Sequence, residues 1–132
     1  MSAARRNETR RRAAYRRGDR AELLCLWQLR FKGYRIIARR YRTPVGEIDL
    51  IARRGSVLAA IEVKARDDFA TASEAVSIRQ RQRIARALEH FLNFRPDLAL
   101  LSPRFDVMLV APRRLPRHLV DACWRFCCHG LF

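Results

Sequence analysis

The sequence predicts an α/β fold in which helices flank a mixed central β-sheet. Residues 34–66 contain three apolar segments separated by turn residues, a pattern typical of neighbouring strands. Residues 20–32 and 74–94 repeat apolar side chains at helical spacing. Another apolar segment follows at 105–111, and a helix that joins two strands is typical of a mixed sheet with helices packed against it. The expected order of elements is α-β-β-β-α-β-α.

Length and charge narrow the class of protein. A chain of 132 residues is expected to form one domain with its own core. The formal net charge of +15 favours a polyanionic partner, with nucleic acid ahead of an anionic membrane surface. A preference for arginine codons would explain arginine over lysine, but not the excess of basic over acidic residues. No apolar run reaches the roughly eighteen residues that span a bilayer, so we expect a cytoplasmic protein without a membrane partner.

The N-terminal residues 1–19 are expected to form a flexible, arginine-rich arm. Over the first twenty positions, eight arginines stand against Glu8 and Asp19. Such an arm can follow a phosphate backbone, and a solvated tail without a role is the equal alternative. The folded domain is expected over 20–128, and 129–132 form a short C-terminal tail.

The first helix is predicted over 20–32 and ends at Gly33. Its apolar residues form one line and a wider stripe beside it, namely Leu23, Trp27 and Phe31 with Leu26 and Leu29. Glu22 precedes Leu26 by one turn and Leu29 by two, so it begins the side that is expected to be buried. In the alternative interpretation, Glu22 is an acid of the first turn that complements the helix dipole.

Acidic residues occupy strand positions where a half-buried sheet is usually apolar. The elements expected here are a strand, a turn and a hairpin, over 34–42, 43–46 and 46–66. Because side chains alternate along a strand, Glu47 and Asp49 share one face of the first hairpin strand. Glu62 and Lys64 share one face of the second strand for the same reason. The spacing D-x12-E-x-K therefore allows two acids and a lysine to meet at one edge of the sheet.

Two interpretations of this acidic edge are open. Carboxylates a few ångströms apart repel one another unless a cation lies between them, and oxygen ligands without histidine or cysteine suit Mg²⁺ or Mn²⁺. Such an ion activates water and takes up charge on a phosphoryl oxygen, and Lys64 could orient that water. The chemistry would be metal-dependent hydrolysis of nucleic acid. Alternatively, Glu62 forms a salt bridge with a nearby arginine and Lys64 forms one with Asp49 or Glu47. The spacing alone does not decide between the two interpretations.

The second helix, over 74–94, presents different residues to the sheet and to solvent. Apolar residues at i, i+4, i+7 and i+8 define its buried side: Ile84, Leu88, Phe91 and Leu92. A second face carries three basic residues, Arg79, Arg83 and Arg86. Gln80 and Arg81 precede Ile84 by four and three residues, so both are expected to point toward the sheet at the start of the helix.

The C-terminal part is expected to add a strand over 105–111 and a last helix over 118–128. Three of the four cysteines lie near the chain end, at Cys123, Cys127 and Cys128. The paired C-x2-C spacing of a zinc site is absent, so free thiols are expected here and at Cys25. The apolar ending CWRFCCHGLF is a candidate dimer seam.

Three motifs in this order resemble the YraN-like family of uncharacterised bacterial proteins: GEIDLIA at 46–52, IEVKAR at 61–66 and RFDV at 104–107. That family resembles the PD-(D/E)XK nucleases, in particular their Holliday-junction-resolvase-like branch. The resemblance covers about residues 18–126. It implies a restriction-endonuclease-like fold and a metal-dependent nuclease acting on DNA, including branched DNA. It also implies Mg²⁺ or Mn²⁺, no organic cofactor, and a homodimer, because the two strands of a junction are cut symmetrically.

The resemblance assigns roles to individual residues. Asp49 matches the metal-binding aspartate of the PD-(D/E)XK nucleases, and Glu62 and Lys64 match their E-x-K motif. Glu22 matches the acid on the first helix that completes the metal site in many members. Gln80 matches a residue of the following helix that often contributes to catalysis, so the resemblance implies a metal site of Glu22, Asp49 and Glu62 with Lys64 and Gln80 beside it.

Departures from the pattern leave a second function open. Ile48 stands where many of these nucleases have a proline, and Arg79 or Arg81 could take the place of Gln80. The residues expected to contact nucleic acid, with DNA ahead of RNA, are Arg66, Arg79, Arg81 and Arg83. Because a shared fold and site do not establish turnover, the alternative is a nucleic-acid-binding module with a catalytically silent site. Glu47 matches no ligand of the family, and its role stays open.

Overall fold

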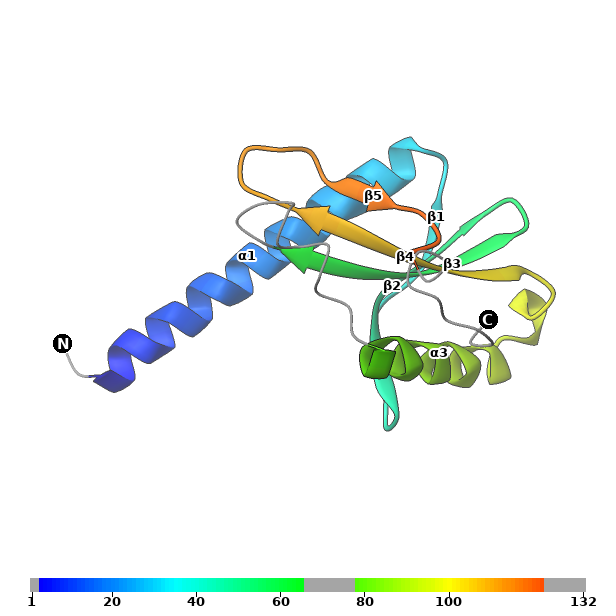
Figure 1. Cartoon of the computed structure of the whole chain (residues 1–132), viewed down its shortest axis with the longest axis horizontal. Helices are drawn as coiled ribbons and strands as arrows, with labels where there is room; N and C mark the ends of the chain where they lie inside the picture. Colours follow the sequence, from blue (N-terminus) through cyan, green and yellow to red (C-terminus); the bar gives the residue numbers. More distant parts are fainter. Residues whose placement is uncertain (1–2, 66–77, 123–132) are drawn as a thin grey trace.

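This computed structural model of the protein describes residues 3–65 and 78–122, without the side chains of 9–18. Its elements are α1 (Ala3–Phe31), β1 (Arg35–Thr43), β2 (Gly46–Arg54), β3 (Val57–Ala65), α3 (Ile78–Asn93), the 3-10 helix η1 (Pro96–Leu98), β4 (Ser102–Val110) and β5 (Arg117–Leu119) (Figure 1). The first four strands lie within about three residues of their predicted positions. The second predicted helix corresponds to α3, and residues 74–77 lie outside the described part.

The five strands form one mixed sheet in the order β1-β2-β3-β4-β5. β1, β2 and β3 are antiparallel neighbours; the chain then crosses over through α3, so that β4 lies parallel to β3 and β5 lies antiparallel to β4. One core, between the sheet and α1, includes Leu50, Ile61 and Met108. The other, between the sheet and α3, includes Ile48, Leu58 and Phe105. The prediction of a mixed sheet flanked by helices is therefore confirmed (Figure 1).

Helix α1 differs from its prediction in its length and in the side that it buries. It begins at Ala3, so the helix extends through most of 1–19, where the sequence predicts a flexible arm. The side chains buried against the sheet are Ala21, Glu22, Cys25, Leu26 and Leu29. Leu23, Trp27 and Phe31 were expected to be buried, and this was wrong, because they are 49%, 69% and 95% exposed.

Apolar residues surround much of α1 near its C-terminal end, which explains this error. Successive residues are rotated by about 100° around a helix. The side of α1 that begins at Leu23 therefore lies next to the side that begins at Glu22, and both sides carry large apolar residues. Helical periodicity alone does not choose between them. The side that packs on the sheet carries the small residues Ala21 and Cys25, which allow the helix backbone to approach the strands. Among the described residues, no helix is both long and apolar enough to cross a membrane.

The last predicted helix is wrong at its start, because Arg117–Leu119 forms strand β5. This short strand pairs with β4 from Val107↔Leu119 to Leu109↔Arg117. The extended backbone directs the His118 ring toward the interior, where only 2% of the side chain is exposed. Residues 120–122 form a turn instead of helix. The rest of the predicted helix (123–128), the tail at 129–132, the candidate dimer seam and the three clustered cysteines lie outside the described residues. Cys25 is a buried free thiol, as predicted.

A fully buried carboxylate, Asp106, attaches β5 and the following turn to β4. Arg104 donates to both of its oxygens, at 2.8 Å each, and its Nη2 also donates to the Tyr34 hydroxyl at 2.6 Å. His118 Nε2 lies 2.8 Å from Oδ2, and the backbone N–H of Asp121 donates to Oδ1 at 3.0 Å. Burial alone would raise the pKa of Asp106, but the hydrogen bonds from His118, Arg104 and Asp121 outweigh it and lower the pKa. The RFDV motif is thus explained by packing and charge pairing.

We expect Asp106→Asn to lower the free energy of unfolding by about 3–5 kcal/mol, because it leaves buried basic partners without their counter-charge. Urea unfolding followed by circular dichroism measures this change. Asp97→Asn is the matched control, since it breaks the exposed pair between Arg95 and Asp97 and should change stability little. Equal, small effects of the two substitutions would contradict a structural role for Asp106.

Candidate functional site

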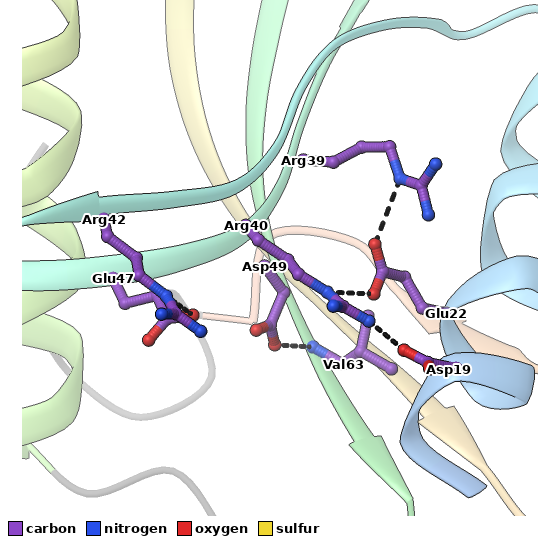
Figure 2. Close-up of polar contacts among 8 residues, drawn as sticks. All are labelled: Asp19, Glu22, Arg39, Arg40, Arg42, Glu47, Asp49 and Val63. Atoms are coloured by element: carbon purple, nitrogen blue, oxygen red, sulfur yellow. Dashed lines mark hydrogen bonds and ion pairs between the residues drawn. The ribbon is translucent and has the colours of Figure 1, made fainter. Parts of the chain in front are cut away.

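The site begins where β2 separates from β3. The two strands pair from Arg54↔Val57 to Leu50↔Ile61, and the pairing ends there. At the next position, the Asp49 carboxylate accepts a hydrogen bond of 2.8 Å from the backbone N–H of Val63 (Figure 2). A side-chain oxygen thus takes the place of a strand partner, and this bond fixes Asp49 beside β3.

Glu62 lies on β3 and collects the other polar side chains that the sequence predicts here. Lys64 Nζ is 3.4 Å from Glu62 Oε1, and Gln80 Nε2 donates to the same oxygen at 3.1 Å. Glu62 and Lys64 share one face of the strand, as the alternation of side chains predicts. Gln80 reaches them from the first turn of α3, where its spacing from Ile84 directs it toward the sheet. Asp49, Glu62, Lys64 and Gln80 are therefore gathered in one place.

The carboxyl groups of Asp49 and Glu62 are close enough to influence each other's pKa. Burial raises the pKa of Glu62 to about 7; the negative charge of Asp49 adds to the rise, while Lys64 opposes it. Burial likewise raises the pKa of Asp49, although the hydrogen bond from Val63 acts against it. These shifts favour retention of a proton by the pair toward neutral pH, as expected for like charges at close range. A divalent cation would relieve the same repulsion, so this oxygen donor set fits Mg²⁺ or Mn²⁺.

These acids open onto a pocket of about 570 Å³ between the end of β1, the start of β2 and the start of α3. Its lining includes Asp49, Glu62 and Gln80 together with the basic residues Arg42 and Arg83. Basic and acidic groups thus share one concave surface, an arrangement that can attract a phosphate and hold a cation beside it.

Glu47 also lines this pocket, but it is paired with an arginine. Its carboxylate lies 3.4 Å from Arg42 Nε, and both side chains are largely exposed (Figure 2). Glu47 is thus the partner of an arginine, and its negative charge also raises the pKa of Asp49.

Gly46 determines how closely β2 approaches α3. A Cβ atom at this position would lie 2.4 Å from the carbonyl oxygen of Arg83, so no side chain fits between the strand and the helix backbone. The first residue of the GEIDLIA motif is therefore a glycine because of a close approach. This contact brings the start of α3, with Gln80, toward the two acids.

Glu22, expected to be the third metal ligand, is buried but engaged elsewhere. Its two oxygens accept hydrogen bonds from Arg39 Nε at 3.1 Å and from Arg40 Nε at 2.9 Å (Figure 2). It lies well inside α1, so the alternative of a first-turn acid does not apply. Within residues 3–65 and 78–122, no three His, Cys, Asp or Glu side chains are gathered closely enough to hold a metal ion.

The arginines expected to contact nucleic acid differ in their positions. Arg79 and Arg83 are exposed on α3, whereas Arg81 faces the sheet and is 4% exposed. Arg66 lies outside the described residues. Sequence reasoning did not single out Arg39 and Arg40, because alternation along a strand assigns adjacent residues to opposite faces. The feature of the sequence that could have pointed to these two arginines is the run of basic residues in β1.

The pH dependence of stability tests the shared proton. The pKa of Glu62 is raised in the folded protein, so protonation of Glu62 stabilises the fold. This stabilisation is fully present at a pH below the ordinary pKa of glutamate, and it is lost as the pH rises through about 7. When the pH is raised from about 5 to about 8, we expect the free energy of unfolding to fall by roughly 3 kcal/mol more in wild type than in Glu62→Gln. Urea unfolding in EDTA at both pH values measures the difference.

The matched control for this experiment is Glu89→Gln, which removes an exposed glutamate from α3. It should follow wild type at both pH values. If Glu62→Gln and wild type lose the same stability between the two pH values, the two carboxyl groups do not share a proton.

Comparisons with known proteins show the family to which the chain belongs. Residues 21–110 match the model of the uncharacterised protein family UPF0102. A UPF0102 protein from Parvibaculum lavamentivorans is 57% identical over 113 residues, which cover 86% of this chain and 84% of the relative. A UPF0102 protein from Chelativorans is 52% identical over 83% of this chain and 88% of the relative. UPF0102 protein Atu0303 from Agrobacterium fabrum is 51% identical over 85% of this chain and 92% of the relative. The resemblance to the YraN-like family is thereby confirmed, and the chain belongs to the uncharacterised family UPF0102.

Proposed function

We propose that this protein is a metal-dependent nuclease that hydrolyses phosphodiester bonds in DNA. The observation that carries the proposal is the pair formed by Asp49 and Glu62, which line one pocket together with arginines and whose pKa values are both raised by burial. Burying two like charges together is costly, and a salt-bridge role alone would not require them to face one another.

Each polar group around the pair has a defined task in this proposal. Asp49 and Glu62 would hold Mg²⁺ or Mn²⁺, which when bound supplies an activated water and stabilises charge on the phosphoryl group. Asp49 is kept in place by the N–H of Val63. Gln80 orients the Glu62 carboxylate through its 3.1 Å hydrogen bond. Lys64, 3.4 Å from the same oxygen, supplies a positive charge next to the position where negative charge would develop.

The charge of the protein supports nucleic acid as the substrate. The net charge of +15 attracts a polyanion over long distances, and Arg42 and Arg83 in the pocket lining can contact the phosphates next to the acids. Arg79 extends the basic surface along α3. DNA ahead of RNA, branched DNA as one substrate class, and a homodimer that cuts two strands are parts of the proposal that rest on the family resemblance.

Cleavage assays with Mn²⁺ on single-stranded, duplex, flap and four-way-junction DNA test the proposal. We expect wild type to cut at least one substrate, and EDTA to stop the reaction. Asp49→Asn and Lys64→Ala should each lower the rate by about 10²–10³-fold, because each removes a charge at the reacting phosphate. Arg95→Ala, which removes an exposed ion pair outside the pocket, should cut like wild type. Absence of cutting on the whole panel would count against an enzyme.

A nucleic-acid-binding module with a silent site is the second candidate. The engagement of Glu22 by Arg39 and Arg40 favours it, because the described part of the chain then offers two metal-binding acids in the pocket rather than three.

For such a module, we expect the affinity for duplex DNA to fall steeply with salt. Neither EDTA nor Glu62→Gln should change that affinity, because no metal would take part in binding. Fluorescence anisotropy with a labelled duplex measures both. Calorimetric binding of Mn²⁺ to the protein alone, lost in Asp49→Asn, would contradict this second candidate.

A further inference from the structure

The ion pairs around Glu22 form a compact cluster between α1 and β1. Arg39 and Arg40 bind different oxygens of the same carboxylate, and Arg40 Nη2 also contacts Asp19 (Figure 2). The carboxylate side chain is 8% exposed, whereas the side chains of Arg39 and Arg40 are 50% and 38% exposed. A buried acid is thus neutralised by arginines that can be reached from outside.

An unusual backbone conformation is needed to bring both arginines to Glu22. Arg40 has φ of 50°, in the left-handed region that disfavours residues with a side chain. The register between β1 and β2 also shifts between Ile36 and Ala38. Without such irregularities, adjacent strand residues would point to opposite faces. The same residue, Arg40, thus combines a positive φ with ion pairs to Glu22 and Asp19.

The same residue lies next to the acidic pocket. The pairs Arg39↔Leu50 and Tyr41↔Ile48 place Arg40 opposite Asp49 in the sheet. Figure 2 shows the Arg40 side chain, which starts beside Asp49 in the view, extending to Glu22 and Asp19. Asp49 and Glu22 also have a common neighbour, Cys25. Burial is the main cause that raises the pKa of the Cys25 thiol to about 12, and the negative charges of Asp49 and Glu22 add to the rise.

Guanidinium groups exchange carboxylates for phosphates readily, because their planar N–H groups fit both. Arg39 contacts Glu22 through Nε, and half of its side chain is exposed. A phosphate can therefore approach Arg39 from the solvent side while Glu22 is still bound. A nucleic acid would supply several such phosphates close to the pocket.

We propose that Arg39 and Arg40 form a phosphate-binding site that competes with Glu22, so that a nucleic-acid phosphate bound there releases Glu22 toward Asp49 and Glu62. The inference rests on the proposed function, since the released carboxylate becomes the third ligand of the metal. Binding of DNA and binding of metal then strengthen one another, and the coupling is reciprocal. The protein alone would bind a divalent cation weakly and the DNA complex would bind it tightly.

Measurement of Mn²⁺ affinity with and without DNA tests this coupling without relying on cleavage. The base protein is Lys64→Ala, so that a short DNA duplex stays intact, and free Mn²⁺ is followed by its electron paramagnetic resonance signal. The same protein with Asp49→Asn gives the blank for Mn²⁺ bound to DNA. We expect the dissociation constant for Mn²⁺ to be about tenfold lower when saturating duplex is present.

Removing the two arginines should abolish the difference. In Arg39→Ala/Arg40→Gly, Glu22 has no competing partner from β1, so Mn²⁺ should bind with similar affinity, within about twofold, with and without saturating duplex. Glycine is chosen at position 40 because it tolerates the positive φ, and circular dichroism verifies that the variant folds. Arg95→Ala removes one arginine and one ion pair elsewhere and should keep the tenfold coupling.

The outcomes separate this inference from the proposed function. Equal Mn²⁺ affinity with and without DNA in the base protein, or full coupling in Arg39→Ala/Arg40→Gly, overturns the phosphate-competition site and leaves the nuclease proposal standing. No Mn²⁺ binding above the Asp49→Asn blank in either condition overturns the metal site itself, and the competition site with it. Loss of coupling in Arg95→Ala as well would show that general charge is responsible.

Discussion

The end of pairing between β2 and β3 is the constraint on which the acidic pocket depends. β2 continues to pair with β1 as far as Gly46, but its last partner on β3 is Ile61. The separation exposes backbone groups of β3, and Asp49 satisfies one of them through the N–H of Val63. It also leaves room for Gln80 to reach Glu62 from α3. One change in strand pairing thus positions side chains from three elements.

Two nearby acidic groups are stabilised in different ways, and the difference bears on function. In the pair of Asp49 and Glu62, burial raises the pKa of both carboxyl groups, which favours a bound proton, and Lys64 opposes the rise. Glu22, which is also buried, forms ion pairs with Arg39 and Arg40. A metal ion can replace either a proton or a guanidinium group. At the pair of Asp49 and Glu62 the proton must first leave, whereas at Glu22 the ion pairs with the arginines must first break.

Much of the fold and part of the site could be predicted from the sequence, and the limits have physical causes. Alternation along strands placed Glu62 with Lys64, and helical spacing turned Gln80 toward the sheet. The side of α1 that carries Leu26 and Leu29 is buried, as predicted. The exposure of Trp27 was not predictable, since apolar residues occupy more of the circumference of α1 than the sheet can cover. The engagement of Glu22 was missed because it depends on the left-handed backbone of Arg40. Periodicity assumes regular backbone and cannot reveal such a residue.

The contact between Gly46 and the backbone of Arg83 has a consequence for how the pocket can vary. Its width at this point is determined by two main chains in contact, with no side chain between them. Substitutions of Arg42, Val45 or Glu47 can therefore change the charge and shape of the lining while the separation of strand and helix is retained. Relatives could therefore bind differently shaped ligands at the same two acids without moving α3. Relatives with different specificities would then differ in the residues that line the pocket and would keep the glycine.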